Sequence, residues 1–341
     1  MIVFAWDGFP QYAARCVGAF VKTTSERVVV VGTRPDVPIE GMEQCCGCEV
    51  IWIERTDERP LATLIGELPR VIVLSGWSIP AYNRYRDEVR LNGGRAVAMC
   101  DNNFVFSLKE CLRAIRFRLL FRGKYDAFFV PGKNGVKLLR FYGVPRDRIQ
   151  TGMYAADATL FKSGKPLSER MKKVVYVGRF NERKNVLRLV RAFQKTNCQD
   201  WSLELYGAGP LKTELMELSK NSPNIKINSF LQPAALAAKY QEARIFILPS
   251  VSEHWGVVVH EAALSGCLLL LSHHIGSADD FLENGVNGFS FDPLSVGDMA
   301  RVMKRALLLH DENLVRASAR SVELGADASL EKFVSAMKGF S

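Results

Sequence analysis

The sequence predicts an α/β protein with two doubly wound domains, in which helices cover both faces of a parallel sheet. The chain has 341 residues, 48% of them hydrophobic, and this length favours two globular domains over one. Short apolar strands alternate with amphipathic helices from one end to the other, an order that is typical of parallel sheets. The polar stretch 162–170, KSGKPLSER, contains Gly and Pro and is predicted to link the two domains.

The strands and helices are predicted from the period of their apolar residues. In the first domain, strands are expected near 1–6, 27–32, 49–53, 70–74, 95–99, 126–130 and 148–152, and helices near 11–24, 60–67, 79–92, 106–122 and 133–142. In the second, strands are expected near 173–178, 202–206, 225–230, 244–249 and 268–272, and helices near 185–196, 210–220, 233–242, 256–265 and 295–309. The predicted domains are therefore 1–162 and 172–325, followed by a C-terminal helix within 326–341.

Charge and composition restrict the possible partners. The net charge is +9, and residues 101–170 alone carry 14 Lys and Arg against 6 Asp and Glu. This excess predicts an anionic partner, and the absence of any helix-turn-helix, zinc or RNP-like motif argues against nucleic acid. No apolar run has the length of a membrane span, and the N-terminus, MIVFAWD, has no basic leader. The eight scattered cysteines predict free thiols in a reducing cytoplasm rather than disulfides or a metal site.

The segment 253–261, EHWGVVVHE, contains two glutamates at a spacing of eight residues. It follows an apolar strand and a Pro-Ser turn, and a helix is expected to start near Gly256. Free backbone N–H groups at such a helix start attract phosphate. Glu253, just before the helix, and Glu261, two turns later, are expected to share one face. The spacing suits a diphosphate with a sugar on each side, although two solvated glutamates arise as easily by chance.

Other motifs surround this segment in a fixed order. Upstream are VGRF at 177–180, RKN at 183–185 and YGAGP at 206–210, and downstream is NGVNGF at 284–289. The succession over about 172–295 resembles the nucleotide-binding half of retaining GT-B glycosyltransferases, especially glycosyltransferase family 4, the glycosyl transferases group 1. This resemblance implies a GT-B fold, with an N-terminal acceptor-binding and a C-terminal nucleotide-sugar-binding Rossmann-like domain around an interdomain cleft. It also implies that the C-terminal helix crosses back to the first domain.

The resemblance assigns roles to four charged residues. Arg179 and Lys184 correspond to the residues that bind the pyrophosphate, Glu261 to the ribose ligand, and Glu253 to the glutamate beside the transferred sugar. Their chemistry agrees, since a guanidinium and an ammonium group suit a diphosphate that gains negative charge as the sugar departs. Two solvated surface cations are the alternative for Arg179 and Lys184.

The backbone is expected to complete the donor site. The N–H groups of Gly256, Val257 and Val258 would face the phosphates, and Gly178 and Gly207 would shape the pocket, although an ordinary turn explains Gly207 equally well. No Asp-x-Asp pair that holds a metal-bridged diphosphate occurs in the chain. The prediction is metal-independent transfer without a cofactor, with a UDP- or GDP-linked sugar as co-substrate.

Asp101 follows the strand 95–99, where many members of the family carry a His near the reacting sugar. Its carboxylate is suited to binding a sugar hydroxyl or to stabilising positive charge at the anomeric carbon. Capping of the following helix is an equally good interpretation.

That following helix, near 106–122, carries five basic residues, Lys109, Arg113, Arg116, Arg118 and Arg122. One apolar stripe is expected to pack on the sheet, formed by Leu108, Cys111, Leu112, Ile115 and Leu119. Phe117, Leu120 and Phe121 are expected on the outward face among the cations, an arrangement that suits an anionic bilayer surface. The alternative is a solvated basic helix whose Phe residues are covered by neighbouring loops.

The motifs and the resemblance together predict a glycosyltransferase of the EC 2.4 class, and the resemblance implies that it is retaining. It would transfer a sugar to a hydroxyl of a glycan or polyprenyl-linked acceptor in bacterial-type surface polysaccharide or glycoconjugate assembly. The expected location is cytoplasmic, peripherally associated with the inner face of the membrane. Two alternatives stay open: a nucleotide-sugar epimerase of GT-B fold, and a non-catalytic nucleotide-sugar-binding subunit of a glycan assembly complex.

Overall fold

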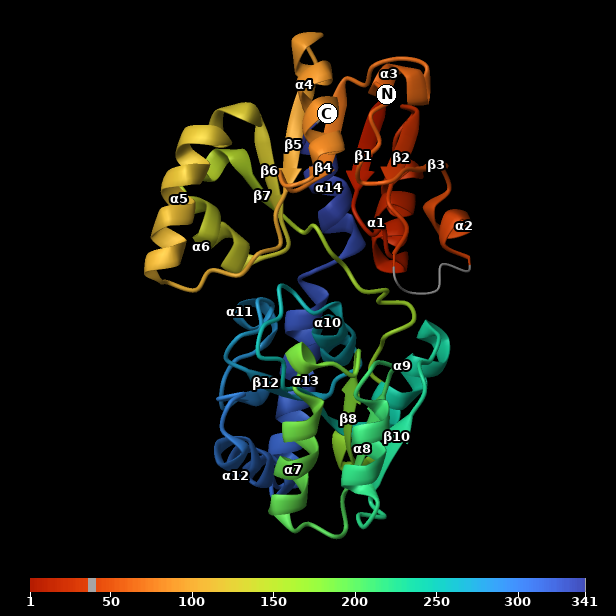
Figure 1. Ribbon diagram of the computed structural model, residues 1–341. Coiled ribbons are helices and arrows are strands. Elements are labelled where there is room, and N and C mark those ends of the chain that lie inside the picture. Colours follow the sequence, from red (N-terminus) through yellow and green to blue (C-terminus); the bar gives the residue numbers. More distant parts are fainter. Residues whose placement is uncertain (36–40, 341) are drawn as a thin grey trace. The chain divides into compact units, whose positions relative to one another are not determined.

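The computed structural model describes residues 1–35 and 41–340 (Figure 1). The chain folds into two compact units. The N-terminal unit consists of Met1–Ala155 together with Ser329–Ser341, and the C-terminal unit is Ala156–Ala328. No helix in the described part of the chain combines the length and the hydropathy that are needed to cross a bilayer.

The described residues of the N-terminal unit form one parallel sheet in the strand order β3-β2-β1-β4-β5-β6-β7. Its strands are β1 (Ile2–Trp6), β2 (Val28–Gly32), β3 (Glu49–Trp52), β4 (Val71–Ser75), β5 (Arg95–Met99), β6 (Ala127–Val130) and β7 (Ile149–Thr151). Its α-helices are α1 (Gln11–Val21), α2 (Met42–Cys46), α3 (Leu61–Ile65), α4 (Pro80–Leu91), α5 (Leu108–Leu120), α6 (Lys133–Phe141) and α14 (Leu330–Phe340).

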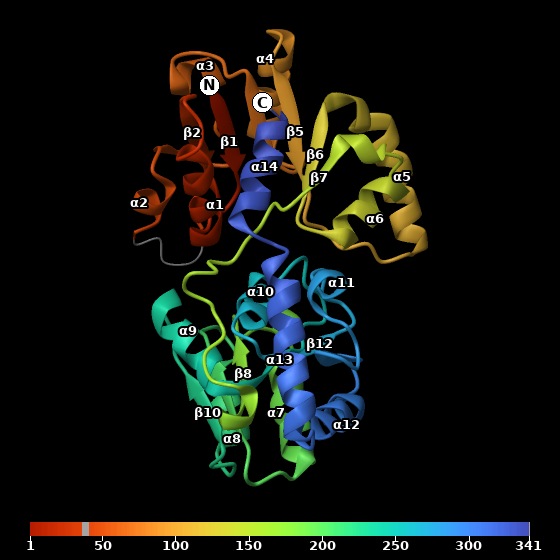
Figure 2. The same cartoon turned by 180° about the vertical axis from the view of Figure 1, so that it is seen from behind.

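Both faces of this sheet are buried, because successive side chains of a strand point to opposite sides. Val3 and Ala5 of β1 belong to the core that α3, α4, α5 and α6 cover. Phe4 faces the other side, where its ring centroid lies 6.3 Å from that of Phe333 in α14. Phe333 also packs against Phe129 of β6, with ring centroids 5.4 Å apart. The C-terminal helix, beside α1 in Figure 2, is therefore part of the core of the N-terminal unit.

The C-terminal unit, all of whose residues are described, contains one parallel sheet in the order β10-β9-β8-β11-β12-β13. Its strands are β8 (Met171–Val177), β9 (Ser202–Tyr206), β10 (Ile225–Asn228), β11 (Ala243–Leu248), β12 (Leu268–Ser272) and β13 (Gly288–Phe291). Its α-helices are α7 (Val186–Thr196), α8 (Lys212–Ser219), α9 (Pro233–Glu242), α10 (Val257–Leu264), α11 (Ala278–Phe281), α12 (Val296–Leu307) and α13 (Asp311–Ala326).

The predicted fold class of two parallel-sheet Rossmann-like domains is confirmed. Every predicted strand is present, and among the described residues four α-helices or strands were missed: α2, α11, β13 and α13. The longest of them, α13, buries small residues such as Ala317, Ser321 and Gly325, so its sequence shows only a weak apolar period.

The predicted orientation of α5 is wrong. Glu110, Ala114 and Phe117 form its buried face, and Phe117 packs against Trp77 and Tyr142 with ring centroids 5.0 Å apart in each case. The apolar residues expected on the sheet are instead exposed: Leu108 (86%), Leu112 (69%), Ile115 (53%) and Leu119 (79%). These four residues are called the outer stripe below. The face with Glu110 packs inward because the hydroxyl of Tyr142 donates a hydrogen bond to the Glu110 carboxylate, and this bond offsets the cost of burying an acid.

Candidate functional site

The carboxyl ends of β8 and β9 carry two loops that pack closely on each other. The N–H of Phe180 donates to the carbonyl of Ala208 at 2.8 Å. A Cβ atom at Gly209 would overlap the backbone of Phe180, and one at Gly207 would overlap the carbonyl of Gly178. Gly209 also has a φ of +155°, a conformation that side chains disfavour. These glycines therefore let the two loops approach backbone to backbone, and this contact fixes the start of the segment that carries Arg179.

Lys184 and Glu253, both given roles by the resemblance, come together in a buried ion pair. The Nζ of Lys184 donates to Oε2 of Glu253, and the hydroxyl of Ser250 donates to the same oxygen at 3.2 Å. Nη1 of Arg183 lies 3.7 Å from Oε1 of Glu253. Both partners of the pair are largely buried, so the pair is held in a medium that strengthens charge interactions.

Glu253 does not lie on the helix, so the expected shared face of Glu253 and Glu261 is not formed by helical periodicity. Helix α10 begins after Gly256, which has a left-handed φ of +78°. The N–H of Glu253 donates to the carbonyl of His274 at 3.1 Å, and its carbonyl accepts from Gly276 at 3.0 Å. Glu253 is thus fixed in a loop before α10, and the N–H groups of Val257 and Val258 belong to the first turn of that helix.

Glu261 is oriented by a residue that the sequence did not indicate. The hydroxyl of Tyr240, a buried residue of α9, donates to Oε2 of Glu261 at 3.1 Å. Burial, and then the charge of Glu261, raises the pKa of Tyr240 well above its usual value, so the hydroxyl stays protonated and remains a donor. Tyr240 occupies an ordinary helical position, and only the fold places it against α10.

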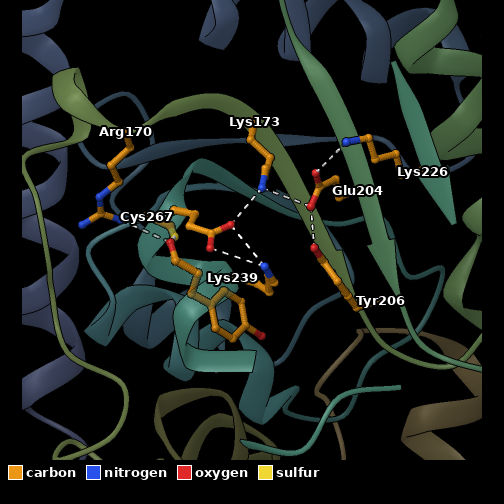
Figure 3. Close-up of polar contacts among 9 residues, drawn as sticks. Arg170, Lys173, Glu204, Tyr206, Lys226, Lys239 and Cys267 are labelled. Atoms are coloured by element: carbon orange, nitrogen blue, oxygen red, sulfur yellow. Dashed lines mark hydrogen bonds and ion pairs between the residues drawn. The ribbon is translucent and has the colours of Figure 1, made fainter. Parts of the chain in front are cut away.

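A network of buried charges ties α9 to the sheet (Figure 3). Nζ of Lys173 on β8 lies 3.1 Å from Oε2 of Glu204 on β9 and 3.1 Å from Oε2 of Glu242 at the end of α9. Burial alone would raise the pKa of Glu242, but the hydrogen bond and charge of Lys173, helped by Lys239, hold it below its usual value. Glu242 thereby stays ionised and anchors the helix that carries Tyr240.

Arg179 is exposed, directly after Gly178, and its backbone carbonyl accepts a hydrogen bond from the hydroxyl of Tyr176 at 2.9 Å. Tyr176 thereby fixes the backbone at Arg179.

Asp101 belongs to the N-terminal unit and accepts a hydrogen bond from the hydroxyl of Tyr154 at 3.1 Å. The interpretation of Asp101 as a helix cap is wrong. Helix α5 is capped by Ser107, whose side chain accepts from the N–H of Glu110 at 3.1 Å.

The histidine of the EHWGVVVHE segment nearest Glu261 is structural. Nδ1 of His260 accepts from the N–H of Ala156 at 3.0 Å, and Nε2 lies 2.8 Å from the carbonyl of Gly325, so the ring is neutral. Burial lowers the pKa of His260 to about 4.

Two further observations concern metals and thiols. Among the described residues, no three His, Cys, Asp or Glu side chains are grouped so that they could hold a metal ion. All eight cysteines are described and are free thiols.

Comparison with known proteins identifies relatives of the C-terminal unit. Residues 157–321, just under half of the chain, match the family model described as Glycosyl transferases group 1. The sulfoquinovosyl transferase SQD2 of Arabidopsis thaliana is 33% identical over 141 residues, which are 40% of this chain and 26% of that protein. An uncharacterised glycosyltransferase of Haemophilus influenzae is 23% identical over 53% of this chain and 52% of its own. The chain thus spans about half or less of the length of these relatives.

Solved structures resemble the whole chain in fold. A glycosyltransferase from Rickettsia africae has a TM-score of 0.79 at 14% identity, covering 99% of this chain and 97% of its own. The Anabaena protein Alr3699/HepE, solved in complex with UDP, has a TM-score of 0.78 at 13% identity and covers 99% of both chains. The chain therefore has the fold of GT-B glycosyltransferases, and its C-terminal unit contains a Glycosyl transferases group 1 domain.

Proposed function

We propose that the protein is a retaining glycosyltransferase that moves a sugar from a nucleotide diphosphate sugar to a hydroxyl of a glycan or polyprenyl-linked acceptor. The cluster of Lys184, Arg183 and Glu253 beside the start of α10, inside the matched domain, carries this proposal. It offers fixed cations and helix N–H groups to a diphosphate and a carboxylate to the adjacent sugar.

The proposed reaction is a front-face displacement. The acceptor oxygen forms a bond to the anomeric carbon while the bond from that carbon to the leaving phosphate oxygen breaks, and the leaving phosphate takes the acceptor proton. Arg179, Lys184 and the first N–H groups of α10 stabilise the charge that develops on the phosphate. Asp101 is assigned to the acceptor side, and Glu261, held by Tyr240, to the ribose.

Metal-independent catalysis is part of the proposal, because cations and a helix terminus do the work that a bridging ion does elsewhere. UDP is the first nucleotide to test, since the Anabaena structure was solved in complex with UDP. The transferase name of the Arabidopsis relative favours transfer over epimerisation, which is the second candidate function.

We also assign the protein to an anionic membrane surface, through α5. The outer stripe offers four exposed aliphatic side chains, and exposed cations flank it on both sides: Lys109, Arg113, Arg116, Arg118 and Arg122. Apolar side chains between cations fit the boundary between acyl chains and anionic headgroups. A role in surface polysaccharide or glycoconjugate assembly at the inner face of a bacterial-type membrane is consistent with such docking.

The test is nucleotide binding followed by transfer. Thermal unfolding is measured with UDP, GDP, ADP and CMP in EDTA, where a ligand at a hundredfold excess over Kd adds about 2.7 kcal/mol to the free energy of unfolding. One diphosphate should raise the melting temperature, and Glu261→Ala should abolish the shift, whereas Lys195→Ala, an exposed cation on α7, should not.

Product analysis separates the candidate functions. Transferred sugar with the donor's anomeric configuration supports the proposal, and an isomerised free sugar supports the epimerase. Binding without turnover, in the presence of vesicles and an acceptor, would favour the non-catalytic subunit.

A further inference from the structure

We propose that a cavity behind α5 binds the phosphate-bearing head of a membrane-anchored acceptor. This inference rests on the proposed transferase function and names the acceptor class and its site. The cavity lies wholly within the N-terminal unit and has a volume of about 550 Å³, which is enough for a phosphate and a sugar ring.

The inner wall of the cavity is aromatic. Trp77, Phe117, Phe121 and Tyr142 line it, and the ring of Trp77 lies 5.0 Å from that of Phe117 and 6.0 Å from that of Phe121. Such a wall is suited to the apolar face of a sugar or to the first carbons of a lipid chain. The cavity therefore has an apolar side before any charged group is considered.

The lining of the cavity also contains polar side chains, among them two arginines. Arg113 and Arg116, both exposed, line the cavity, and Nη1 of Arg113 is 3.0 Å from Oε2 of the buried Glu110. Glu110 also accepts from the hydroxyl of Tyr142, and the lining contains this one carboxylate and two arginines. The lining therefore carries an excess of positive charge, and an arginine fork binds phosphate oxygens in pairs.

The cavity lies where the fold places ligands. Trp77 follows the end of β4, and Asn102 and Asn103 follow the end of β5, so these lining residues stand at the carboxyl edge of the sheet. Ligands of doubly wound folds bind at that edge. Asp101, the predicted acceptor ligand, directly precedes Asn102 in the same loop.

The helix α5 connects this cavity to the outer stripe. At about 100° per residue, the outer stripe is centred about 160° from the buried face of Glu110, Ala114 and Phe117. Arg116 and Arg113 occupy the flank between the two, with Arg116 nearer the stripe and Arg113 nearer the cavity. If the stripe rests on a bilayer, a lipid phosphate passes Arg116 and then Arg113 on its way to the aromatic wall.

This arrangement favours an amphiphile over a water-soluble glycan. A water-soluble glycan would make no favourable contact with the exposed leucines, or with the cationic flank that leads from them to the cavity. A polyprenyl or acyl phosphate uses all three features: the stripe at the bilayer, the arginines at the phosphate and the aromatic wall beyond them.

The proposal is tested with farnesyl phosphate as the probe, compared with farnesol and with inorganic phosphate. Binding to the full chain is measured by titration calorimetry below the concentration at which the probe aggregates. Farnesyl phosphate should bind, and Arg113→Gln/Arg116→Gln should weaken it about tenfold or more, because two charge-assisted contacts are lost. Lys195→Gln removes an exposed cation of α7 in the C-terminal unit, far from the flank of α5 in sequence and absent from the cavity lining, and it should leave the affinity unchanged.

Three results would overturn the proposal. The first is equal binding of farnesyl phosphate by wild type and by the double variant, and the second is equal binding of farnesol and farnesyl phosphate by wild type. The third is binding of inorganic phosphate with the same affinity, which shows a simple anion site. UDP binding is measured in the same samples. No UDP binding by wild type contradicts the transferase proposal, while an intact UDP response with no farnesyl phosphate binding contradicts the acceptor site alone.

Discussion

Replacing Leu112 and Leu119 of the outer stripe by serine is expected to release the protein from anionic vesicles. The two side chains are 69% and 79% exposed, so most of their apolar surface is free to enter the bilayer interface. Full burial of a leucine side chain contributes about 1.5–3 kcal/mol, and these exposures reduce the gain to roughly 1.5 kcal/mol each. The double substitution should therefore cost about 3 kcal/mol of binding, which is about a hundredfold in the partition coefficient.

The assay is flotation with phosphatidylcholine vesicles that contain phosphatidylglycerol, with the bound fraction measured against lipid concentration. The matched control is Leu294→Ser/Leu308→Ser, two leucines of the C-terminal unit with similar exposures of 61% and 65%. The control variant should bind the vesicles as wild type does. Raising the salt concentration should weaken vesicle binding by wild type and by the control, because the cations that flank the outer stripe contribute to it.

A result in which the Leu112/Leu119 variant and the control lose binding equally would refute the reasoning. So would unchanged binding by both. Serine at Phe117 is not a useful variant, because that ring is buried against Trp77 and its loss is expected to unfold the region before it changes any surface.

Three further predictions concern the C-terminal unit. Tyr240→Phe removes the hydrogen bond to Glu261, so UDP should bind about three- to tenfold more weakly, while 2′,3′-dideoxy-UDP should be unaffected in a calorimetric comparison. Gly209→Ala should lower the melting temperature well beyond Gly285→Ala, because both have positive φ but only at Gly209 does the new Cβ meet a neighbouring backbone. The pKa of His260 falls from 6.5 in the unfolded chain to about 4 in the fold, so the unfolded state binds the extra proton and stability should drop by about 3 kcal/mol as pH falls from 6.5 to 4. Chemical denaturation across that range checks it, and His260→Gln should flatten the profile.

The strands were predictable because most of them are short runs of buried apolar residues bounded by turns. Strands such as β2 (VVVVG) and β12 (LLLLS) have apolar side chains on both faces, and all of these are buried when the strand lies inside a sheet that is covered on both sides. The orientation of α5 was not predictable from the same rule. Its apolar stripe is real, but the side that packs is decided by Glu110, which finds a hydroxyl donor 32 residues away in Tyr142. A helical period identifies two faces and does not say which one meets a sheet.

The candidate site likewise contains residues that the sequence indicated and residues that it did not. Lys184 and Glu253 were predicted from motifs 69 residues apart, and the structure joins them in one ion pair. The residues that contact the predicted ones, Arg183 and Ser250 at Glu253 and Tyr240 at Glu261, were not singled out, because their roles depend on which loops and helices the fold brings together. Of these, only Arg183 had a signal, its place beside Lys184 in the same motif.

The two units differ in how far their proposed binding sites can be recognised from sequence motifs. In the C-terminal unit the loops touch backbone to backbone at Gly207 and Gly209, and a buried cation meets a buried carboxylate, so few residue types can replace these. Such constraints leave recognisable motifs, and the family match lies over this unit, at residues 157–321. In the N-terminal unit the candidate acceptor site consists of an aromatic wall, two exposed arginines and a stripe of aliphatic side chains. Many residues serve those purposes equally well, so no motif results, and the acceptor must be sought through the surface chemistry of α5 rather than through sequence likeness.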